Sequence, residues 1–563
     1  MRQKPRGLAG VLVSFAAVAC NGQIADLPPD EGNAPSDRSP TDTTPTSTTP
    51  TTSPAAKFQP APAGLRRLTR IQYANAIRDL LGADVAVPPT LDGDTVLSGF
   101  ASIGAALTTY SATTAEKLES LAMNVAQQAL GDPARRARLV SCVPKATVDD
   151  ACARAFLASI GRRAWRRPPA DDELARYVAI AKLGAETLGD FWQGLSYALA
   201  GVLQSPSFLY RVEIGGPGPT RGQRVFDSWE LATRLSFFLW NTTPDDALLA
   251  AAEGGTLTRP GELQKQAERL LASPRARLAM KDFFGELLRL EGLDDLEQSP
   301  TAFPMATRTI GPAMREETLR FLDEIVFGAA GDYRRAIDAP TTFVNRELAR
   351  LYGLPQPAGT GFEPAALPSE GLRVGLLGQA SFLALNAHET SSSPTRRGKF
   401  VREVLLCHEI PSPPPDVDTS LPEDPKGSAP RTMREKLSAH NVPGCAACHS
   451  RMDPIGLAFE NFDAIGKLRT TEVGKPIDAS GALDGARFGN ARELAGLLRA
   501  HPDIDGCLTR GLYRYAVAHV ETAGEEGLLA RIAAAGGNAQ QRFRALLLGI
   551  VDSEGFRVAA ETP

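Results

Sequence analysis

The sequence predicts a mainly α-helical protein made of several packed helical modules, with a small hairpin in its C-terminal module. Two observations carry this prediction: apolar residues recur at helical spacing along most of the chain, and alternating strand patterns are sparse. The 563 residues are enough for about four domains of ordinary size. Hydrophobic residues make up 43% of the chain, which is enough to fill several helical cores.

The first twenty residues carry a targeting signal. A basic start, Arg2–Arg6, precedes an apolar run, Leu8–Ala19, that is shorter than the ~20 residues of a transmembrane helix. Small residues then precede Cys20, which resembles a bacterial lipoprotein signal in which this cysteine is lipidated and becomes the first mature residue. We therefore predict a signal peptide at residues 1–20 and a lipid anchor to the bacterial membrane, on the periplasmic side or at the cell surface. The alternative is ordinary cleavage of the signal peptide that leaves Cys20 unmodified. Either interpretation predicts that the protein is exported.

Residues 21–63 are predicted to be a disordered tether. They are rich in proline, threonine and serine, as in Thr43–Pro50, and this composition cannot bury enough apolar surface to fold. In a polyproline-like form at ~3 Å per residue, such a tether spans on the order of 100 Å. It would join the anchor to the folded body.

The body begins with three helical modules, predicted at residues 64–135, 136–188 and 189–335. The first helix starts after Thr69, a typical N-cap, and stops at Gly82. A basic run, Arg162–Pro168, is interpreted as a solvated face. The further helices are predicted at 115–130, 156–163, 171–183, 191–204, 229–240, 262–271, 275–290 and 314–327.

A fourth module is predicted at residues 336–435, and a cytochrome-c-like module at 436–563. The fourth contains short helices at 345–353, 375–386 and 399–407, and it ends in a stiff proline-rich connector, Pro411–Pro415. Its Ser/Arg-rich loop is interpreted as a connection, and exposure of Arg396 and Arg397 to an anionic ligand is the alternative.

The most specific motif is Cys445-Ala446-Ala447-Cys448-His449, the attachment pattern of c-type haem. Two thiols about one helical turn apart can bond both vinyl groups of one porphyrin edge, and the adjacent histidine then reaches the iron. Export agrees with this interpretation, because c-type haem is attached outside the cytoplasm. Two alternatives stay open: a redox disulfide between the two cysteines, and zinc bound with Cys407 or Cys507 and a histidine.

The sixth haem ligand is not fixed by the sequence. No methionine follows Met452, which is too close to the motif to reach the opposite face of the haem. The candidates are His519, His501, His440 and Met433. An open position is the alternative, and it would permit peroxide or small-ligand chemistry.

The remaining cysteines form an even set. Once Cys20 and the haem pair are set aside, two disulfides can form among Cys142, Cys152, Cys407 and Cys507. Cys142 and Cys152 bracket a short loop, which favours a local bridge.

The segment after the motif is predicted to hold a turn, a helix and a hairpin. Asp453–Gly456 is interpreted as a turn. Phe459, Phe462, Ile465 and Leu468 recur at three-residue spacing, which indicates one apolar face of a helix. The Gly and Asp residues of 477–485 favour a hairpin.

These motifs, taken in order, resemble the planctomycete-type cytochrome-like proteins, exported chains assembled from consecutive domains of unknown function. The resemblance covers nearly everything from Leu65 to Phe556. It rests on Leu68–Gly82, Phe156–Pro168, Leu203–Arg211 with Arg234–Trp240, Arg396–Cys407, Cys445–His449, Met452–Gly456 and Phe459–Gly466. The family implies no settled activity. Many members carry a separate N-terminal cytochrome module that this chain lacks, and Tyr515–His519 departs from the family's C-terminal Tyr-Ala-Leu-Gly-Arg-like stretch.

The sequence favours a haem protein of extracytoplasmic electron transfer, with an unidentified redox partner. The rivals are a cell-surface structural or ligand-binding protein with disulfide-paired cysteines, and a haem peroxidase-like enzyme. A near-neutral balance of 61 basic and 65 acidic residues argues against a nucleic-acid partner. The sequence shows no Ser-His-Asp signature, phosphate loop or carboxylate pair that would indicate another class of enzyme.

Overall fold

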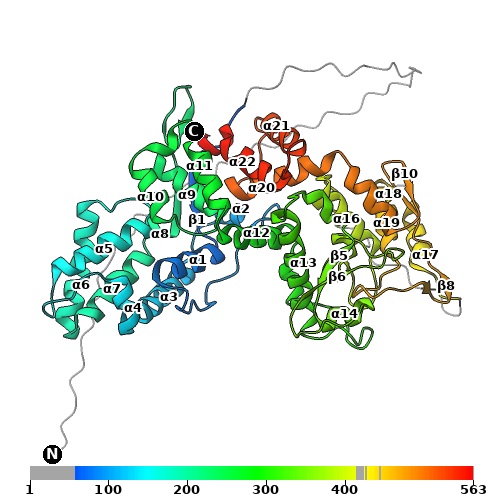
Figure 1. Cartoon of the computed structure of the whole chain (residues 1–563), viewed down its shortest axis with the longest axis horizontal. Coiled ribbons are helices and arrows are strands. Elements are labelled where there is room, and N and C mark those ends of the chain that lie inside the picture. Colours follow the sequence, from blue (N-terminus) through cyan, green and yellow to red (C-terminus); the bar gives the residue numbers. More distant parts are fainter. Residues whose placement is uncertain (1–57, 414–423, 425–427, 443–444, 562–563) are drawn as a thin grey trace, which may run out of the picture. The chain divides into compact units, whose positions relative to one another are not determined.

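The structure is a computed structural model that describes residues 58–413, 424, 428–442 and 445–561. The described residues are 56% helical, with 23 α-helices among them and only small antiparallel strand groups, so the predicted mainly α class is confirmed (Figure 1). The predicted signal peptide, Cys20 and residues 21–57 of the tether lie outside the described residues. No helix in the described part of the chain is long and apolar enough to cross a membrane.

The helices follow one another with short connections. The first twelve are α1 (Arg70–Leu81), α2 (Ala101–Leu107), α3 (Ala112–Gly131), α4 (Pro133–Leu139), α5 (Asp150–Ala164), α6 (Asp171–Leu188), α7 (Phe191–Leu203), α8 (Pro206–Leu209), α9 (Ser228–Leu239), α10 (Asp246–Glu253), α11 (Glu262–Leu271) and α12 (Pro274–Leu287). The others are α13 (Ile310–Phe327), α14 (Arg346–Tyr352), α15 (Ala380–Leu385), α16 (Pro394–Phe400), α17 (Met433–Leu437), α18 (Ala446–Gly456), α19 (Ala491–Ala500), α20 (Asp503–Val517), α21 (Glu526–Gly537), α22 (Arg542–Asp552) and α23 (Glu554–Arg557).

The strands are short and pair in five groups. Their bounds are β1 (Gly64–Arg67), β2 (Tyr210–Glu213), β3 (Gly216–Pro217), β4 (Gln223–Val225), β5 (Thr341–Val344), β6 (Glu363–Ala366), β7 (Thr471–Glu472), β8 (Lys475–Pro476), β9 (Gly481–Leu483), β10 (Ala486–Phe488) and β11 (Val558–Ala560). The antiparallel groups are β1–β2, β11–β4–β3, β5–β6, β7–β8 and β9–β10. The β9–β10 pair turns at Asp484 and Gly485, which confirms the predicted hairpin.

The predicted helix signals act as expected at α1. The side chain of Thr69 accepts a hydrogen bond from the backbone of Gln72, whose own side chain accepts from the backbone of Thr69, so a complete capping box opens the helix. Gly82 ends it with a positive φ of 116°, a conformation that glycine adopts readily. Local chemistry therefore fixes both ends of this helix.

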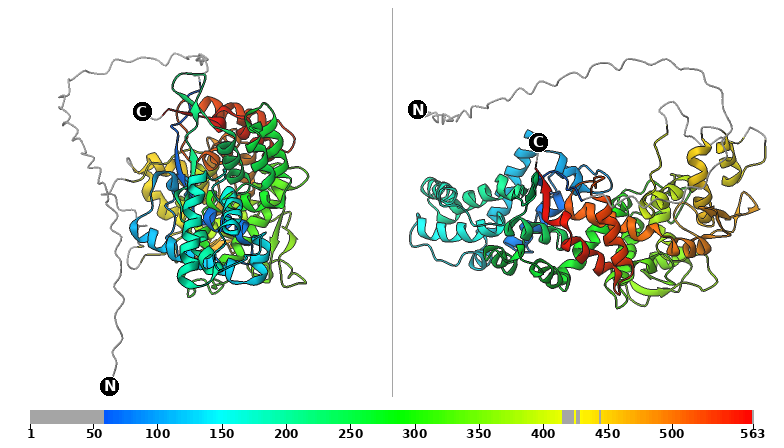
Figure 2. Two further views of the ribbon diagram at one scale, coloured as in Figure 1. Left: turned by 90° about the vertical axis from the view of Figure 1, so that its left-hand side faces the viewer. Right: turned by 90° about the horizontal axis from the view of Figure 1, so that it is seen from above.

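Two hydrophobic cores hold the helices together. The first joins α1, α3, α5, α6 and α7 around buried residues such as Tyr73, Phe156 and Phe208. The second runs from Phe100 to Ala559 and includes residues of α9, α11, α12 and α13 together with the C-terminal α20 and α22. Because the chain returns to its middle in this way, residues from different predicted modules share a core. Figure 2 shows the C-terminal helices (red) beside the green middle helices in both views.

The end of the predicted tether already belongs to the body. The backbone N–H of Gln59 donates to the carbonyl of Gly524, and that of Ala63 donates to the carbonyl of Ala560. Ala61 is buried. Residues 58–63, predicted as the end of the tether, are therefore paired with the C-terminal segment, a contact that composition alone does not show.

A buried charge cluster links β1, β2 and α9. Glu213 is completely buried, and Arg66, Arg211 and Arg234 surround its carboxylate at 2.8–3.6 Å. Burial alone would raise the pKa of Glu213, but the three guanidinium groups lower it to about 2. Arg211 and Arg234, which belong to the family-like stretches Leu203–Arg211 and Arg234–Trp240, therefore serve as buried partners of Glu213.

Arg166 of the basic run is buried as well, so the interpretation of Arg162–Pro168 as a solvated face is wrong at this position. It is 3% exposed. Its guanidinium donates to backbone carbonyls at the end of α5 and around α8, those of Ala164, Ser207, Phe208 and Tyr210. Several backbone carbonyls that lack partners meet where the chain turns, and one guanidinium can donate to all of them. A run of basic residues in the sequence does not show that these carbonyls lie nearby.

Candidate functional site

The Cys-x-x-Cys-His motif lies at the beginning of α18 (Figure 1). Cys445 precedes the first turn of the helix, and Cys448 lies within that turn, so the two thiols are neighbours on one helix face. Both are free and partly exposed, and the structure does not join them to each other. Two accessible thiols at this spacing are the donor pair that a porphyrin edge needs.

His449 is held by Asp453, one turn further along α18. Nδ1 of His449 lies 2.9 Å from Oδ2 of Asp453, and the hydroxyl of Thr395 on α16 donates to Oδ1 of the same carboxylate at 2.7 Å. Because a carboxylate only accepts hydrogen bonds, we assign the imidazole proton to Nδ1. Nε2 then keeps its lone pair and is the nitrogen available to a metal.

Two further features surround this histidine. The ring of His440 lies against that of His449, with 4.2 Å between ring centroids. Ligand atoms of His440, His449 and Asp453 all lie within 4.8 Å of one another, a set of two histidines and a carboxylate that suits a divalent metal. Burial, with a smaller contribution from His449, lowers the pKa of His440, which favours its neutral, metal-binding form.

Helices α16 and α18 are in close backbone contact at two glycines, Gly398 and Gly456. A Cβ at Gly398 would overlap the carbonyl of Met452, and a Cβ at Gly456 would overlap the carbonyl of Pro394. This contact brings Thr395 to Asp453. Asp453–Gly456, predicted as a turn, lies inside α18 instead, with Pro454 within the helix, because tertiary packing overrides the local preference of proline.

Arg397 on α16 is fully buried, so its proposed exposure to an anionic ligand is excluded. Its guanidinium donates to the carbonyls of Leu383, Phe459, Phe462 and Asp463.

The helix predicted over Phe459–Leu468 does not form. Arg397 takes carbonyls that such a helix would use, and the side chain of Asp463 accepts from the backbone of Ile465 and Lys467. Phe459, Phe462 and Ile465 are buried, whereas Leu468 is 49% exposed.

The structure places only one of the predicted sixth ligands against the motif histidine. The rings of His440 and His449 are in contact, with 4.2 Å between their centroids, so His440 would have to move away from His449 to serve as a second ligand of the same haem. His501 contacts Asp484, His519 contacts Glu525, and Met433 is buried with Leu437 and Leu457. The identity of the sixth ligand stays a prediction.

Both predicted disulfides form. Cys142 pairs with Cys152, ten residues away, and Cys407 pairs with Cys507, one hundred residues away. The second bridge encloses the whole motif segment. Because Cys407 and Cys507 bind each other, the alternative in which one of them joins the motif as a zinc ligand is excluded.

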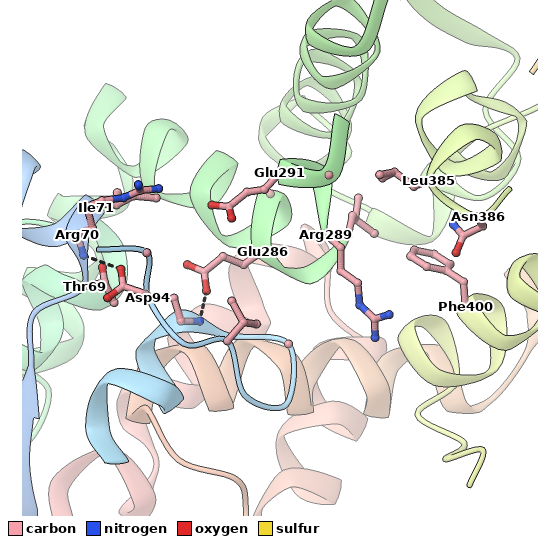
Figure 3. Close-up of a pocket in the computed structure, with 17 residues that line it drawn as sticks. Thr69, Arg70, Ile71, Asp94, Glu286, Arg289, Glu291, Leu385, Asn386 and Phe400 are labelled. Carbon is pink, nitrogen blue, oxygen red and sulfur yellow. Dashed lines mark hydrogen bonds between the residues drawn. The ribbon is translucent and has the colours of Figure 1, made fainter. Parts of the chain in front are cut away.

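A cavity of about 480 Å³ opens between α1, the loop before α2, and the ends of α12 and α15. Figure 3 shows the carboxylates of Asp94, Glu286 and Glu291 gathered at one end, with Leu385 and Phe400 at the other. The backbone N–H of Ala101 donates to Glu286 at 2.7 Å. Burial raises the pKa of Glu286 to about 8, and the nearby carboxylates of Asp282, Glu291 and Asp94 add to the shift.

Replacing Glu286 with glutamine is expected to stabilise the protein increasingly as the pH rises. The pKa of this carboxyl group is 4.5 in the unfolded chain and about 8 in the folded one. Between these pH values the folded state holds a proton that the unfolded state has lost, so the wild-type protein loses stability as the pH rises through the interval. Melting curves of wild type and Glu286→Gln at pH 5 and pH 8 would measure this. A difference in melting temperature that is the same at both values would contradict the prediction.

The donor set of the motif fits a covalently bound haem. The two thiols are free, they lie within one turn, and the adjacent imidazole has an available Nε2 whose other nitrogen is already bonded. A small apolar cluster, Met433, Leu437 and Leu457, is contributed by α17 and the turn after α18. The cysteines and the histidine would provide attachment and ligation if a haem binds here.

Sequence reasoning did not identify the two residues that support His449. The spacing of His449 and Asp453, four residues apart on one helix, was a readable signal for a contact. Thr395 carried none, because its position beside Asp453 depends on the crossing of α16 and α18.

Five family models match the chain in succession, each described as a protein of unknown function. They are DUF1587 at residues 66–131, DUF1595 at 152–213, DUF1592 at 226–354, DUF1588 at 373–472 and DUF1585 at 484–556. The DUF1588 match, also called PSCyt3, contains both α16 and the Cys-x-x-Cys-His motif, so the module boundary predicted at 435/436 falls inside it. No curated protein and no solved structure matches the chain.

Proposed function

The chain belongs to the planctomycete-type cytochrome-like family of multidomain proteins, and from this premise we propose that it is a c-type haem protein of extracytoplasmic electron transfer. The observation that carries the proposal is the arrangement at the start of α18. Free thiols at Cys445 and Cys448 lie one turn apart, beside a histidine with an available Nε2.

In this proposal each residue has a defined task. Cys445 and Cys448 would hold the porphyrin through thioether bonds, and His449 would ligate the iron. The haem, when bound, supplies a one-electron redox couple. Asp453 and the α16–α18 contact would keep the imidazole of His449 in place.

The location is part of the same proposal. A lipidated Cys20 would hold the protein at the bacterial membrane, and the proline-rich segment that follows would carry the body away from it. A redox partner protein would then meet the haem module outside the cytoplasm.

Protein produced with a haem-attachment system tests the proposal. We expect a sharp Soret band and haem that stays bound to the denatured chain. Cys445→Ala should reduce covalent haem to a small fraction of the wild-type level, since one of two thioether bonds is lost. The double variant Cys142→Ala/Cys152→Ala removes two cysteines that do not belong to the motif and should retain the haem. Wild-type protein without covalent haem would refute the proposal.

A second function is favoured by the cluster of His440, His449 and Asp453. Two imidazoles and a carboxylate within 4.8 Å are a ligand set for a zinc-like ion. Metal analysis of protein made without haem attachment would detect it. Stoichiometric zinc that is lost in His440→Ala, but retained in His519→Ala, would support this function over the first.

A further inference from the structure

We propose that Asp453 is a positioning residue that fixes the orientation and the tautomer of His449, and that Thr395 fixes Asp453 in turn. This inference rests on the proposed haem function and deepens it. It begins with the chain of contacts from Thr395 Oγ1 to Asp453 Oδ1 at 2.7 Å, and from Asp453 Oδ2 to His449 Nδ1 at 2.9 Å.

The contacts of Asp453 point to this task. Its side chain is 11% exposed, and each carboxylate oxygen has a partner among the described residues: the hydroxyl of Thr395 and the imidazole of His449. Neither partner is a backbone N–H, so the carboxylate does not cap a helix. Burying a carboxylate destabilises the folded state unless the carboxylate accepts hydrogen bonds. Here one oxygen accepts from the imidazole of His449 and the other from Thr395, which holds the carboxylate in position.

The chemistry at the ring follows from this geometry. A carboxylate at Nδ1 requires the proton on that nitrogen and leaves Nε2 as the ligand atom. A charged acceptor also makes the imidazole a stronger electron donor, as the carboxylate partners of metal-bound histidines do. A stronger donor favours the oxidised iron, so Asp453 would lower the reduction potential of the haem.

The test compares Asp453→Asn with wild type, using the reduction potential of the haem-loaded protein. We expect the equilibrium constant for reduction to rise about tenfold or more, which is about 59 mV for a one-electron couple. Thr395→Val keeps the His449–Asp453 contact and loses only the outer bond, so a shift smaller than that of Asp453→Asn is expected. Asp503→Asn is the matched control, because it removes the carboxylate that contacts His408, away from the motif.

A second measurement does not require haem. The ¹⁵N shifts of His449 in the apoprotein report which ring nitrogen carries the proton, and we expect the Nδ1–H form in wild type and a mixture in Asp453→Asn. If haem binds but Asp453→Asn and Asp503→Asn share the wild-type potential, the inference is overturned while the haem function stands. If wild type binds no haem, the haem function fails, and unchanged ¹⁵N shifts in Asp453→Asn would overturn the inference as well.

Discussion

Replacing Gly398 with alanine is expected to lower the free energy of unfolding by about 3 kcal/mol or more, because overpacking against rigid backbone is among the costliest substitutions. The added methyl group would overlap the carbonyl oxygen of Met452, which belongs to the backbone of α18 and cannot rotate away. The two helices would have to separate. Denaturant titration followed by intrinsic fluorescence would measure the loss.

Gly496→Ala is the matched control for this prediction. Gly496 lies within α19, and a Cβ there meets no atom within 4 Å. Alanine should therefore stabilise that helix by up to about 1 kcal/mol through its higher helix propensity. If Gly398→Ala were as stable as Gly496→Ala, the backbone contact of α16 with α18 would not be as close as described.

The same substitution should disturb the motif. Thr395 reaches Asp453 only because α16 and α18 lie in backbone contact, and Asp453 in turn holds His449. Separation of the helices would weaken the Thr395 bond first. The packing of two glycines therefore connects directly to the position of the proposed iron ligand.

The helices were predictable where their signals are local. Thr69 and Gly82 define α1 through capping chemistry that involves only neighbouring residues. The two disulfides were predictable from an even number of cysteines in a chain whose first residues predict export. The hairpin was predictable from the Gly and Asp residues around position 484, because their turn preference is also a local signal.

The failures share a physical cause. Pro454 indicates a turn by its own preference, yet the packing of Gly456 on Pro394 keeps it inside α18. The spacing of Phe459 and Phe462 indicates a helix, but a buried arginine from another segment takes their carbonyls. In each case a contact between residues distant in sequence outweighs the local preference, and a sequence alone does not show such contacts.

The candidate site divides in the same way. The motif residues and the available thiols followed from a five-residue pattern, whereas the support of His449 by Thr395 depends on tertiary structure. The contact of His449 with Asp453 is local to α18, but the bond that holds Asp453 itself comes from another helix. This division explains why the family resemblance locates the proposed haem but leaves its redox properties open.

Removing the Cys407–Cys507 bridge is expected to destabilise the protein more than removing Cys142–Cys152. A cross-link lowers the entropy of the unfolded chain by an amount that grows with the enclosed loop, about 4.7 kcal/mol for a loop of about 100 residues and about 2.7 kcal/mol for about ten. The two bridges enclose loops of these sizes. Denaturation of the two double Cys→Ala variants should therefore differ by about 2 kcal/mol, with the long-range variant less stable.

The long bridge also joins the two ends of the motif segment, because residues 407 and 507 flank α17, α18 and the hairpin. Without it, this segment is held by non-covalent contacts, among them the α16–α18 packing and the hydrogen bonds that Arg397 donates to its carbonyls. We expect limited proteolysis to cut Cys407→Ala/Cys507→Ala between these two positions faster than wild type, whereas Cys142→Ala/Cys152→Ala should be cut there no faster than wild type. Equal stability and equal cleavage of the two variants would show that tertiary packing, and not the cross-link, holds the proposed haem segment to the body.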